Sequence, residues 1–202
     1  RISQTGFVRS PAALIVDPTP DFFTAWVGTF LHQLANDPGI SWLALDTEFV
    51  EKAGGADESE VLSWDKSSPI TRINVAASIQ AGLTVPYREP YIREVQRLFD
   101  GVNHHQGYVF CWNKYADLDH LWAHGHHLDN LNVIDLMWAW HYLQSDLPRG
   151  LGFVAPLASD FGPWKHWAKQ PAREGEYAAA DALQDALALW QDSIWYKRAW
   201  ST

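Results

Sequence analysis

The chain has 202 residues, of which 47% are hydrophobic and 19% charged, so it can bury a full hydrophobic core and most simply forms one globular α/β domain. Its net charge of −9 argues against wide, sequence-independent binding to duplex nucleic acid, although it leaves open a site that grips a few nucleotides through metal ions. No apolar stretch approaches the length that spans a bilayer, which predicts a soluble protein, and a single cysteine excludes an internal disulfide and fits a reducing compartment.

Strands and helices alternate along the sequence. Apolar runs predict strands at residues 12–16, 42–48, 70–80, 83–87, 108–112 and 131–134. Helical periodicity predicts helices at 21–35, 91–99, 113–124, 135–143, 151–157 and 174–195. The segment 1–11 is expected to be a lead-in and 51–69 an exposed loop. Strands that alternate with helices around a hairpin predict a mixed sheet with helices packed on it.

Local patterns define the caps, turns and faces of these elements. Asp21 is expected to cap the first helix, whose predicted apolar stripe consists of Phe22, Trp26, Phe30 and Leu34. Ala81-Gly82 is the expected turn of the hairpin. The predicted apolar face of the helix at 113–124 consists of Leu118, Leu121 and Trp122.

Asp46 and Glu48 lie two residues apart at the end of the apolar run Trp42-Leu43-Ala44-Leu45. In a strand this spacing aims both carboxylates from the same face of the sheet, because side chains alternate between faces. Two like charges held that close repel each other unless a cation lies between them, so the pair is costly without a metal ion and useful with one. The alternative is a strand that ends in an acidic, solvated turn.

Two helices carry further acidic residues. Asn113 and Asp117 are four residues apart, as are Tyr177 and Asp181, so each pair projects from one face of its helix. Carboxylates from one strand and two helices form the oxygen ligand set that Mg²⁺ takes. Two such ions can stabilise the attacking and the leaving oxygen of a phosphodiester displacement, with Tyr177 close enough to orient the attacking water. The simpler alternative for Asp117 and Asp181 is an ordinary exposed acid on a helix.

Three segments resemble the exonuclease motifs of the DEDDy branch of the DnaQ-like 3′–5′ exonucleases: Asp46-Thr47-Glu48, Asn113-Lys114-Tyr115-Ala116-Asp117 and Tyr177-Ala178-Ala179-Ala180-Asp181. Each motif is weak alone, but three in order on suitable elements are a strong signal. The resemblance is greatest to the proofreading domain of family A DNA polymerases, especially phage-type ones, and covers residues 12–198. It implies a ribonuclease H-like fold, in which a mixed central β-sheet is flanked by α-helices, within one exonuclease domain over residues 1–202.

The resemblance also implies roles for individual residues. The implied ligands of two Mg²⁺ or Mn²⁺ ions are Asp46, Glu48, Asp117 and Asp181. Tyr177 would orient or activate the attacking water. The candidates for substrate contact are Thr47, Phe49, Asn113 and Phe153. The implied substrate is the single-stranded or frayed 3′ end of DNA, with a DNA polymerase as a partner in cis or in trans, in the cytoplasm of a bacterial cell or phage-infected host.

Two alternatives stay open. Segments 46–50 and 176–181 are also similar to ribonuclease D and Werner-type exonucleases, which makes RNA an alternative substrate. A non-catalytic nucleic-acid-binding domain of a larger polymerase is the second alternative. The intact set of four carboxylates with Tyr177 favours the enzyme, because a binding module has no reason to keep uncompensated acids together.

Other polar and aromatic side chains have simpler explanations. The histidines 120, 124, 126 and 127 suggest zinc, but no cysteine or acidic partner completes a tetrahedral set, so a packed or solvated face is the better explanation. Asp135 is expected to be a helix N-cap and Cys111 a small core residue of a strand. Core packing is favoured over base stacking for four aromatic residues, Phe49, Phe153, Trp164 and Trp167.

Overall fold

The computed structural model describes residues 13–37, 42–50, 68–78, 80–158 and 164–188. The expected lead-in at 1–11 and the end of the last helix, residues 189–195, lie outside these described residues, as does most of the loop expected at 51–69. None of the helices described has the length and apolar character that crossing a membrane requires.

Six strands form one mixed sheet in the order β1-β4-β3-β2-β5-β6. The strands are β1 (Ala13–Val16), β2 (Trp42–Phe49), β3 (Ile70–Ser78), β4 (Ala81–Pro86), β5 (Tyr108–Cys111) and β6 (Asn132–Asp135). β3 runs antiparallel to both of its neighbours, β2 and β4, and the other pairs are parallel. The mixed sheet with a β3–β4 hairpin therefore agrees with the prediction from the sequence.

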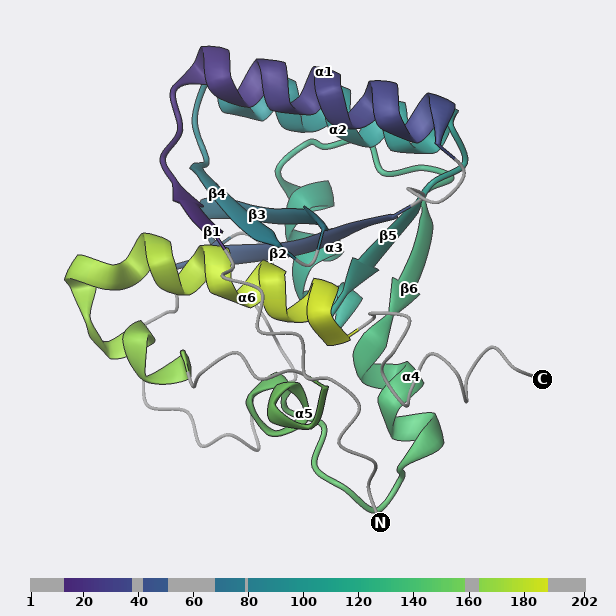
Figure 1. Ribbon diagram of the computed structural model, residues 1–202, viewed down its shortest axis with the longest axis vertical. Coiled ribbons are helices and arrows are strands. Elements are labelled where there is room, and N and C mark those ends of the chain that lie inside the picture. Colours follow the sequence, from purple (N-terminus) through teal and green to yellow (C-terminus); the bar gives the residue numbers. More distant parts are fainter. Residues whose placement is uncertain (1–12, 38–41, 51–67, 79, 159–163, 189–202) are drawn as a thin grey trace.

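Helices cover both faces of this sheet (Figure 1). They are α1 (Pro20–Asn36), α2 (Tyr91–His104), α3 (Lys114–Ala123), α4 (Leu136–Leu143), α5 (Leu151–Ala158) and α6 (Glu174–Ala188). α1 and α2 lie side by side over one face, while α6 crosses the opposite face and contacts α5 (Figure 1). Two short 3₁₀ helices, Lys165–Lys169 and Pro171–Arg173, lead into α6.

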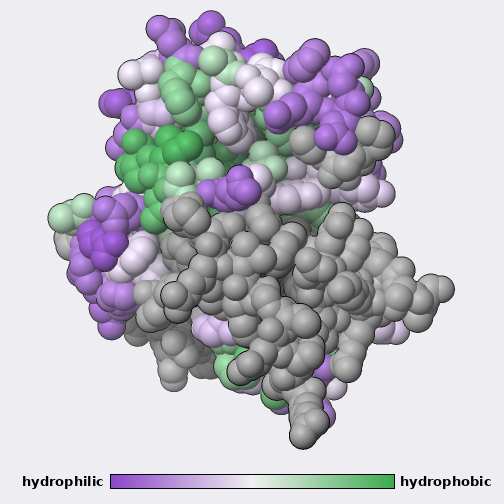
Figure 2. All heavy atoms as spheres, in the orientation of Figure 1, coloured by the Kyte–Doolittle hydropathy of each residue, from purple (hydrophilic) through white to green (hydrophobic). Residues whose placement is uncertain are grey.

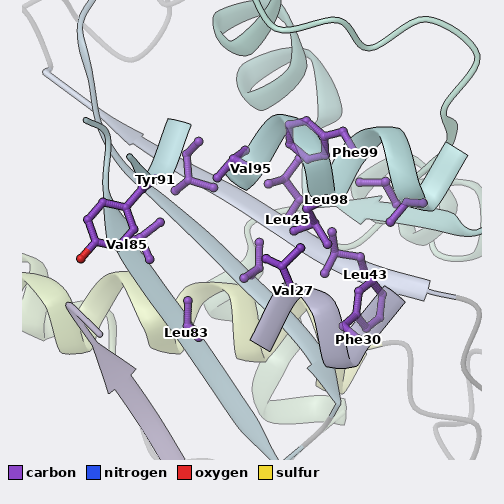
Figure 3. Close-up of a cluster of buried hydrophobic side chains, with 14 of the residues drawn as sticks. Val27, Phe30, Leu43, Leu45, Leu83, Val85, Tyr91, Val95, Leu98 and Phe99 are labelled. Atoms are coloured by element: carbon purple, nitrogen blue, oxygen red, sulfur yellow. The ribbon is translucent and has the colours of Figure 1, made fainter. Parts of the chain in front are cut away.

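The main hydrophobic core lies between the sheet and the α1–α2 layer. Figure 3 shows the side chains at its centre: Val27, Phe30, Leu43, Leu45, Leu83, Val85, Tyr91, Val95, Leu98 and Phe99. Hydrophilic side chains are spread over the outer side of this layer, and an apolar area lies below α1 at the left of the view (Figure 2). Cys111 is buried in this core, as expected. Because every second residue of β2 enters the core, the residues between them face α6.

α6 packs closely on the opposite face because small residues line the contact. Ala178, Ala179 and Ala182 are fully buried there. A side-chain carbon at Gly82 of β4 would lie 1.9 Å from the carbonyl oxygen of Ala179, so only glycine allows this approach. The close contact brings the polar residues of α6 within reach of the β2 side chains that face it.

The first helix differs from the prediction in its cap and in its buried stripe. Thr19, not Asp21, is the N-cap, since its hydroxyl accepts a hydrogen bond from the Phe22 N–H at 3.3 Å and Pro20 follows in the first turn. The buried residues are Phe23, Val27, Phe30 and Leu34. Phe22 is 48% exposed. A strict four-residue spacing drifts about 40° around a helix at each step, so the stripe beginning at Phe22 leaves the buried face.

Three further details were predicted wrongly. Ala81 and Gly82 are not the hairpin turn but the start of β4, where they pair with β1. α2 continues beyond Phe99 to His104, with Val102 buried in its last turns. On α3, Trp122 is 71% exposed, whereas Asp117, His120 and Leu121 are buried. Polar side chains can lie on the inner face of α3 because they find hydrogen-bond partners there, as His120 does with the carbonyl oxygen of Ala116.

Candidate active site

β2 places two carboxylates on the α6 side of the sheet. Leu43 and Leu45 point into the core beneath α1 and α2, while Ala44 packs against α6. Asp46 and Glu48 continue the Ala44 side of the strand, since alternate residues share a face. The two-residue spacing in the sequence therefore predicts the direction of both side chains correctly.

α6 adds a third carboxylate from the facing layer. Asp181 is buried one turn after Tyr177, which is half-buried on the same side of the helix. One carboxylate oxygen from each of Asp46, Glu48 and Asp181 lies within 4.8 Å of the others, and we call these residues the acid cluster. Convergent carboxylate oxygens are the donor set that hard cations such as Mg²⁺ and Mn²⁺ take, so the acid cluster fits a divalent metal ion.

Asp117 adjoins the acid cluster but has other partners. Its Oδ1 accepts hydrogen bonds from the backbone N–H and the hydroxyl of Thr47, both at 2.8 Å. The pairing of β2 with β5 ends at Ala44. Beyond that residue the Thr47 backbone N–H has no partner strand on this edge, and the Asp117 side chain of α3 accepts its hydrogen bond instead. The predicted four carboxylates are thus present as a group of three with Asp117 beside it. Thr47, expected to contact substrate, is 5% exposed and bonded to Asp117.

A chain of hydrogen bonds across the sheet holds Asp46. Asn74 on β3 donates through Nδ2 to Asp46 Oδ2 at 2.7 Å, and the Thr84 hydroxyl on β4 donates to Asn74 Oδ1 at 2.6 Å. Arg72 Nε donates to the Thr84 oxygen at 2.9 Å, and its guanidinium also pairs with Asp17. A guanidinium can only donate, so the Thr84 proton goes to the Asn74 oxygen and the Asn74 amide must present its nitrogen to Asp46. The orientation of the Asp46 carboxylate is therefore fixed from the sheet side.

Two side chains that precede α6 hold Asp181. The buried Trp164 donates through Nε1 to Asp181 Oδ1 at 2.5 Å. Lys165 Nζ lies 2.8 Å from each of the two Asp181 oxygens and 3.3 Å from the Tyr177 hydroxyl. Lys165 thus brings an ammonium group into direct contact with the acid cluster.

Burial and mutual repulsion raise the pKa values of three carboxyl groups at the site, those of Asp46, Glu48 and Asp117. Burial, with the neighbouring Asp181 charge, raises the pKa of Asp46 to about 7, and burial together with Asp46 raises the pKa of Glu48 to about 9. The pKa of Asp117 also lies well above its ordinary value through burial and Asp46, although the Thr47 hydrogen bonds act in the opposite direction. Burial and the Asp181 charge raise the pKa of Tyr177, so its hydroxyl keeps its proton at neutral pH.

The structure places the proposed substrate contacts in different settings. Phe153 on α5 is 42% exposed, whereas Phe49 is partly buried and its ring stacks on His120 with centroids 4.1 Å apart. Asn113 adopts a left-handed conformation, with φ of 70°, just before α3. Its backbone N–H donates to Asp135 Oδ1 at 3.2 Å, so Asp135 fastens this turn as well as capping α4. Of the four aromatic residues expected to pack, Trp164 is buried and Phe49 and Trp167 are partly buried, but the expectation was wrong for Phe153, which is exposed.

Among the histidines at 120–127, His120 and His126 are buried and His127 is exposed, which fits the packed or solvated face that the sequence favours. His124 Nδ1 lies 2.8 Å from the His120 carbonyl oxygen, and His126 is buried beside Phe99. In the part of the chain that the structure describes, the acid cluster is the group of three or more side chains placed to ligate one ion.

Solved structures of ribonuclease D from Trypanosoma brucei share this architecture. The complex with RNA U12 aligns with a TM-score of 0.53 and 16% identity over 89% of this chain and 63% of that one. The complex with GMP aligns with a TM-score of 0.58 and 14% identity over 91% of this chain and 59% of that one. A third ribonuclease D structure aligns with a TM-score of 0.56 and 16% identity over 94% of this chain and 68% of that one. The fold is ribonuclease D-like.

This likeness confirms the predicted α/β class with a mixed sheet of ribonuclease H type. The chain spans about 63% of the length of the first ribonuclease D structure. No protein-family model matches the sequence, and comparison with curated proteins finds no relative. At 14–16% identity the ribonuclease D-like fold is what the comparison establishes, and the chemistry of the site depends on its own geometry.

Sequence reasoning missed three residues that contact the acid cluster in this ribonuclease D-like fold. Asn74 could have been noticed, because a lone amide between Ile73 and Val75 in a buried strand must find a hydrogen-bond partner. Trp164 and Lys165 lie in a connector without periodicity, where the only signal is a lysine next to a tryptophan.

We expect the metal-free protein to lose stability as pH rises. The folded Asp46 and Glu48 have pKa values of about 7 and about 9, against ordinary values of 3.8 and 4.5, so between these limits the folded state binds more protons than the unfolded state. Raising pH through this window therefore lowers the free energy of unfolding. A divalent ion would bind the ionised form of the carboxylates, so Mg²⁺ should raise the melting temperature more at about pH 8.5 than at about pH 6. Thermal melts check this, and Glu48→Gln should weaken the pH dependence. Equal Mg²⁺ effects at both pH values would contradict it.

Proposed function

We propose that the protein is a metal-dependent 3′–5′ exonuclease that removes nucleotides one at a time from single-stranded or frayed 3′ ends. The observation that carries the proposal is the convergence of Asp46, Glu48 and Asp181 within 4.8 Å, with Asp117 and the Tyr177 hydroxyl beside them. This arrangement stands on a ribonuclease D-like fold. It supports phosphodiester hydrolysis, because carboxylate oxygens that converge at this separation repel one another and are the ligands that divalent ions take.

In the proposed reaction the acid cluster and Asp117 would hold two Mg²⁺ or Mn²⁺ ions, which would supply positive charge to the attacking and the leaving oxygen of the displacement. Asn74 keeps the Asp46 carboxylate in one orientation, and Trp164 does the same for Asp181 through its Nε1 hydrogen bond. Tyr177 stays protonated, so its hydroxyl donates a hydrogen bond and orients the attacking water rather than removing its proton. Phe153, which is 42% exposed on α5, is the aromatic side chain that we assign to contact a terminal base.

The chain's charge of −9 supports an end-directed reaction. Few phosphates can bind to such a surface without metal ions, so the strand is expected to enter from its end and to present one terminal phosphodiester. Intact duplex should be a poor substrate until its end frays. In its more specific form, the proposal assigns the protein a proofreading role beside a DNA polymerase, in the cytoplasm of a bacterium or phage-infected cell.

RNA is the second candidate substrate. The motifs at 46–50 and 176–181 resemble those of ribonuclease D, and one of the similar solved structures is ribonuclease D in complex with RNA U12. We keep DNA as the first substrate on the segment from Asn113 to Asp117, whose pattern is most similar to polymerase proofreading domains.

The deciding experiment uses 5′-labelled single strands of DNA and of RNA with the same base sequence, incubated with Mg²⁺ or with excess chelator. We expect a ladder that shortens from the 3′ end in one-nucleotide steps and requires the metal ion. The strand that is degraded faster shows whether the enzyme prefers deoxyribose or ribose. A circular strand should resist. Internal products first, cleavage of the circle, or full activity in chelator would refute the exonuclease, and binding without any cleavage would favour the non-catalytic alternative.

A further inference from the structure

Lys165 lies where its charge acts directly on the acid cluster. Its Nζ is 2.8 Å from both oxygens of Asp181, 3.3 Å from the Tyr177 hydroxyl, and 5.2 Å from the centre of the Tyr177 ring. Asp181 itself is buried, with its side chain 6% exposed, while the side chain of Lys165 is 42% exposed. The ammonium group therefore reaches the buried carboxylate from the solvent side.

Among the described residues, Lys165 is the basic side chain with an ion pair to the acid cluster. Arg72 belongs to the hydrogen-bond chain that holds Asp46, but its guanidinium contacts Thr84 and forms its ion pair with Asp17. Asp46, Glu48 and Asp181 repel one another at this separation, so one ammonium group lowers the cost of holding them together without a metal ion. Within the described part of the chain, Lys165 therefore supplies the positive charge next to the acid cluster.

The same contacts conflict with metal binding. A divalent ion bound by Asp181 needs a lone pair of a carboxylate oxygen, and Lys165 Nζ sits at hydrogen-bond distance from both of those oxygens. Two cations at one carboxylate also repel each other. The metal ion and the ammonium group therefore compete for Asp181.

We propose that Lys165 is a built-in competitor of the metal ion, which occupies Asp181 when divalent ions are scarce and is displaced when they bind. The proposal rests on the proposed function, because it assigns a regulation to the same site. The side chain can leave by rotation about its own bonds, since it is flexible and partly exposed. The concentration of Mg²⁺ at which the site fills is then set by the strength of the Lys165–Asp181 contact.

Lys165→Met tests this, because methionine keeps most of the length and removes the charge. Calorimetric titration with Mn²⁺ or Mg²⁺, without nucleic acid, should show binding about 5- to 10-fold tighter than wild type, the size expected of a partly exposed ion pair. Lys169→Met is the matched control, since Lys169 is exposed in the same 3₁₀ helix, and it should change binding less than about 2-fold. Unchanged or weaker binding in Lys165→Met would overturn the proposal.

The wild-type protein gives a second, independent measurement. Reductive methylation of lysine amines, followed by mass spectrometry, should show Lys165 protected in metal-free buffer and more reactive once Mg²⁺ is added. Lys169 should react equally in both. Reactivity of Lys165 that does not rise with Mg²⁺ would overturn the proposal even if the variant failed to fold. If the wild-type protein binds no divalent ion at millimolar concentration, the proposed function is wrong. If it binds the ion with the same affinity as Lys165→Met, only the proposal of competition by Lys165 is wrong.

Discussion

Asp46→Asn will reduce the single-turnover rate of 3′ nucleotide release by about 10³-fold or more, because in the proposed exonuclease Asp46 is a metal ligand whose charge contributes about 4 kcal/mol of transition-state stabilisation. The measurement is quenched-flow cleavage of a 5′-labelled strand at saturating Mg²⁺. A rate within a few-fold of wild type would show that Asp46 holds no catalytic ion.

The same variant should fold normally. In metal-free buffer it should melt no lower than wild type, because the change removes one member of a repelling group and the new amide oxygen can still accept the Asn74 hydrogen bond. Asp100→Asn is the matched control, since Asp100 is exposed on α2, on the other side of the sheet, and that change should leave both rate and melting temperature unaffected. A markedly lower melting temperature for Asp46→Asn would mean that lost stability, not lost chemistry, explains a low rate.

Tyr177→Phe should slow the reaction by about 10²-fold, the usual contribution of one positioned proton donor or acceptor. The Tyr177 hydroxyl lies 3.3 Å from Lys165 Nζ, which also contacts Asp181. Burial and the Asp181 charge raise the pKa of Tyr177, so the hydroxyl keeps its proton and can donate a hydrogen bond. The ring keeps its place in the packing against α5, so the fold and the metal affinity should change little. Single-turnover rates at saturating Mg²⁺, together with calorimetric metal affinity, separate these effects.

Tyr142→Phe provides the control for loss of a phenol hydroxyl, because Tyr142 is exposed on α4. It should behave as wild type. A Tyr177→Phe rate equal to wild type would make Tyr177 a packing residue and leave the orientation of the water to another group. If metal affinity fell by the same factor as the rate, the role of Tyr177 would be to position Asp181 for metal binding and not to orient the water.

The sequence by itself determined which residues could act together. The two-residue spacing of Asp46 and Glu48 in a strand and the four-residue spacing of Tyr177 and Asp181 in a helix fix the direction of each pair, because both follow from local backbone geometry. The alternation of elements likewise determined the mixed sheet. Local rules failed where neighbours decide, as at Trp122, which is exposed although helical periodicity favours burial.

Only the tertiary structure decided what each carboxylate contacts. Asp46 meets Asn74 through the register of β2 and β3, 28 residues apart, and Asp117 meets Thr47 across 70 residues. Lys165 reaches Asp181 from a connector with no periodic pattern, after Gly82 lets α6 approach the sheet. Hydrogen bonds and ion pairs depend on distances that the packing of remote segments sets to within a fraction of an ångström, and periodicity carries information about direction but not about distance.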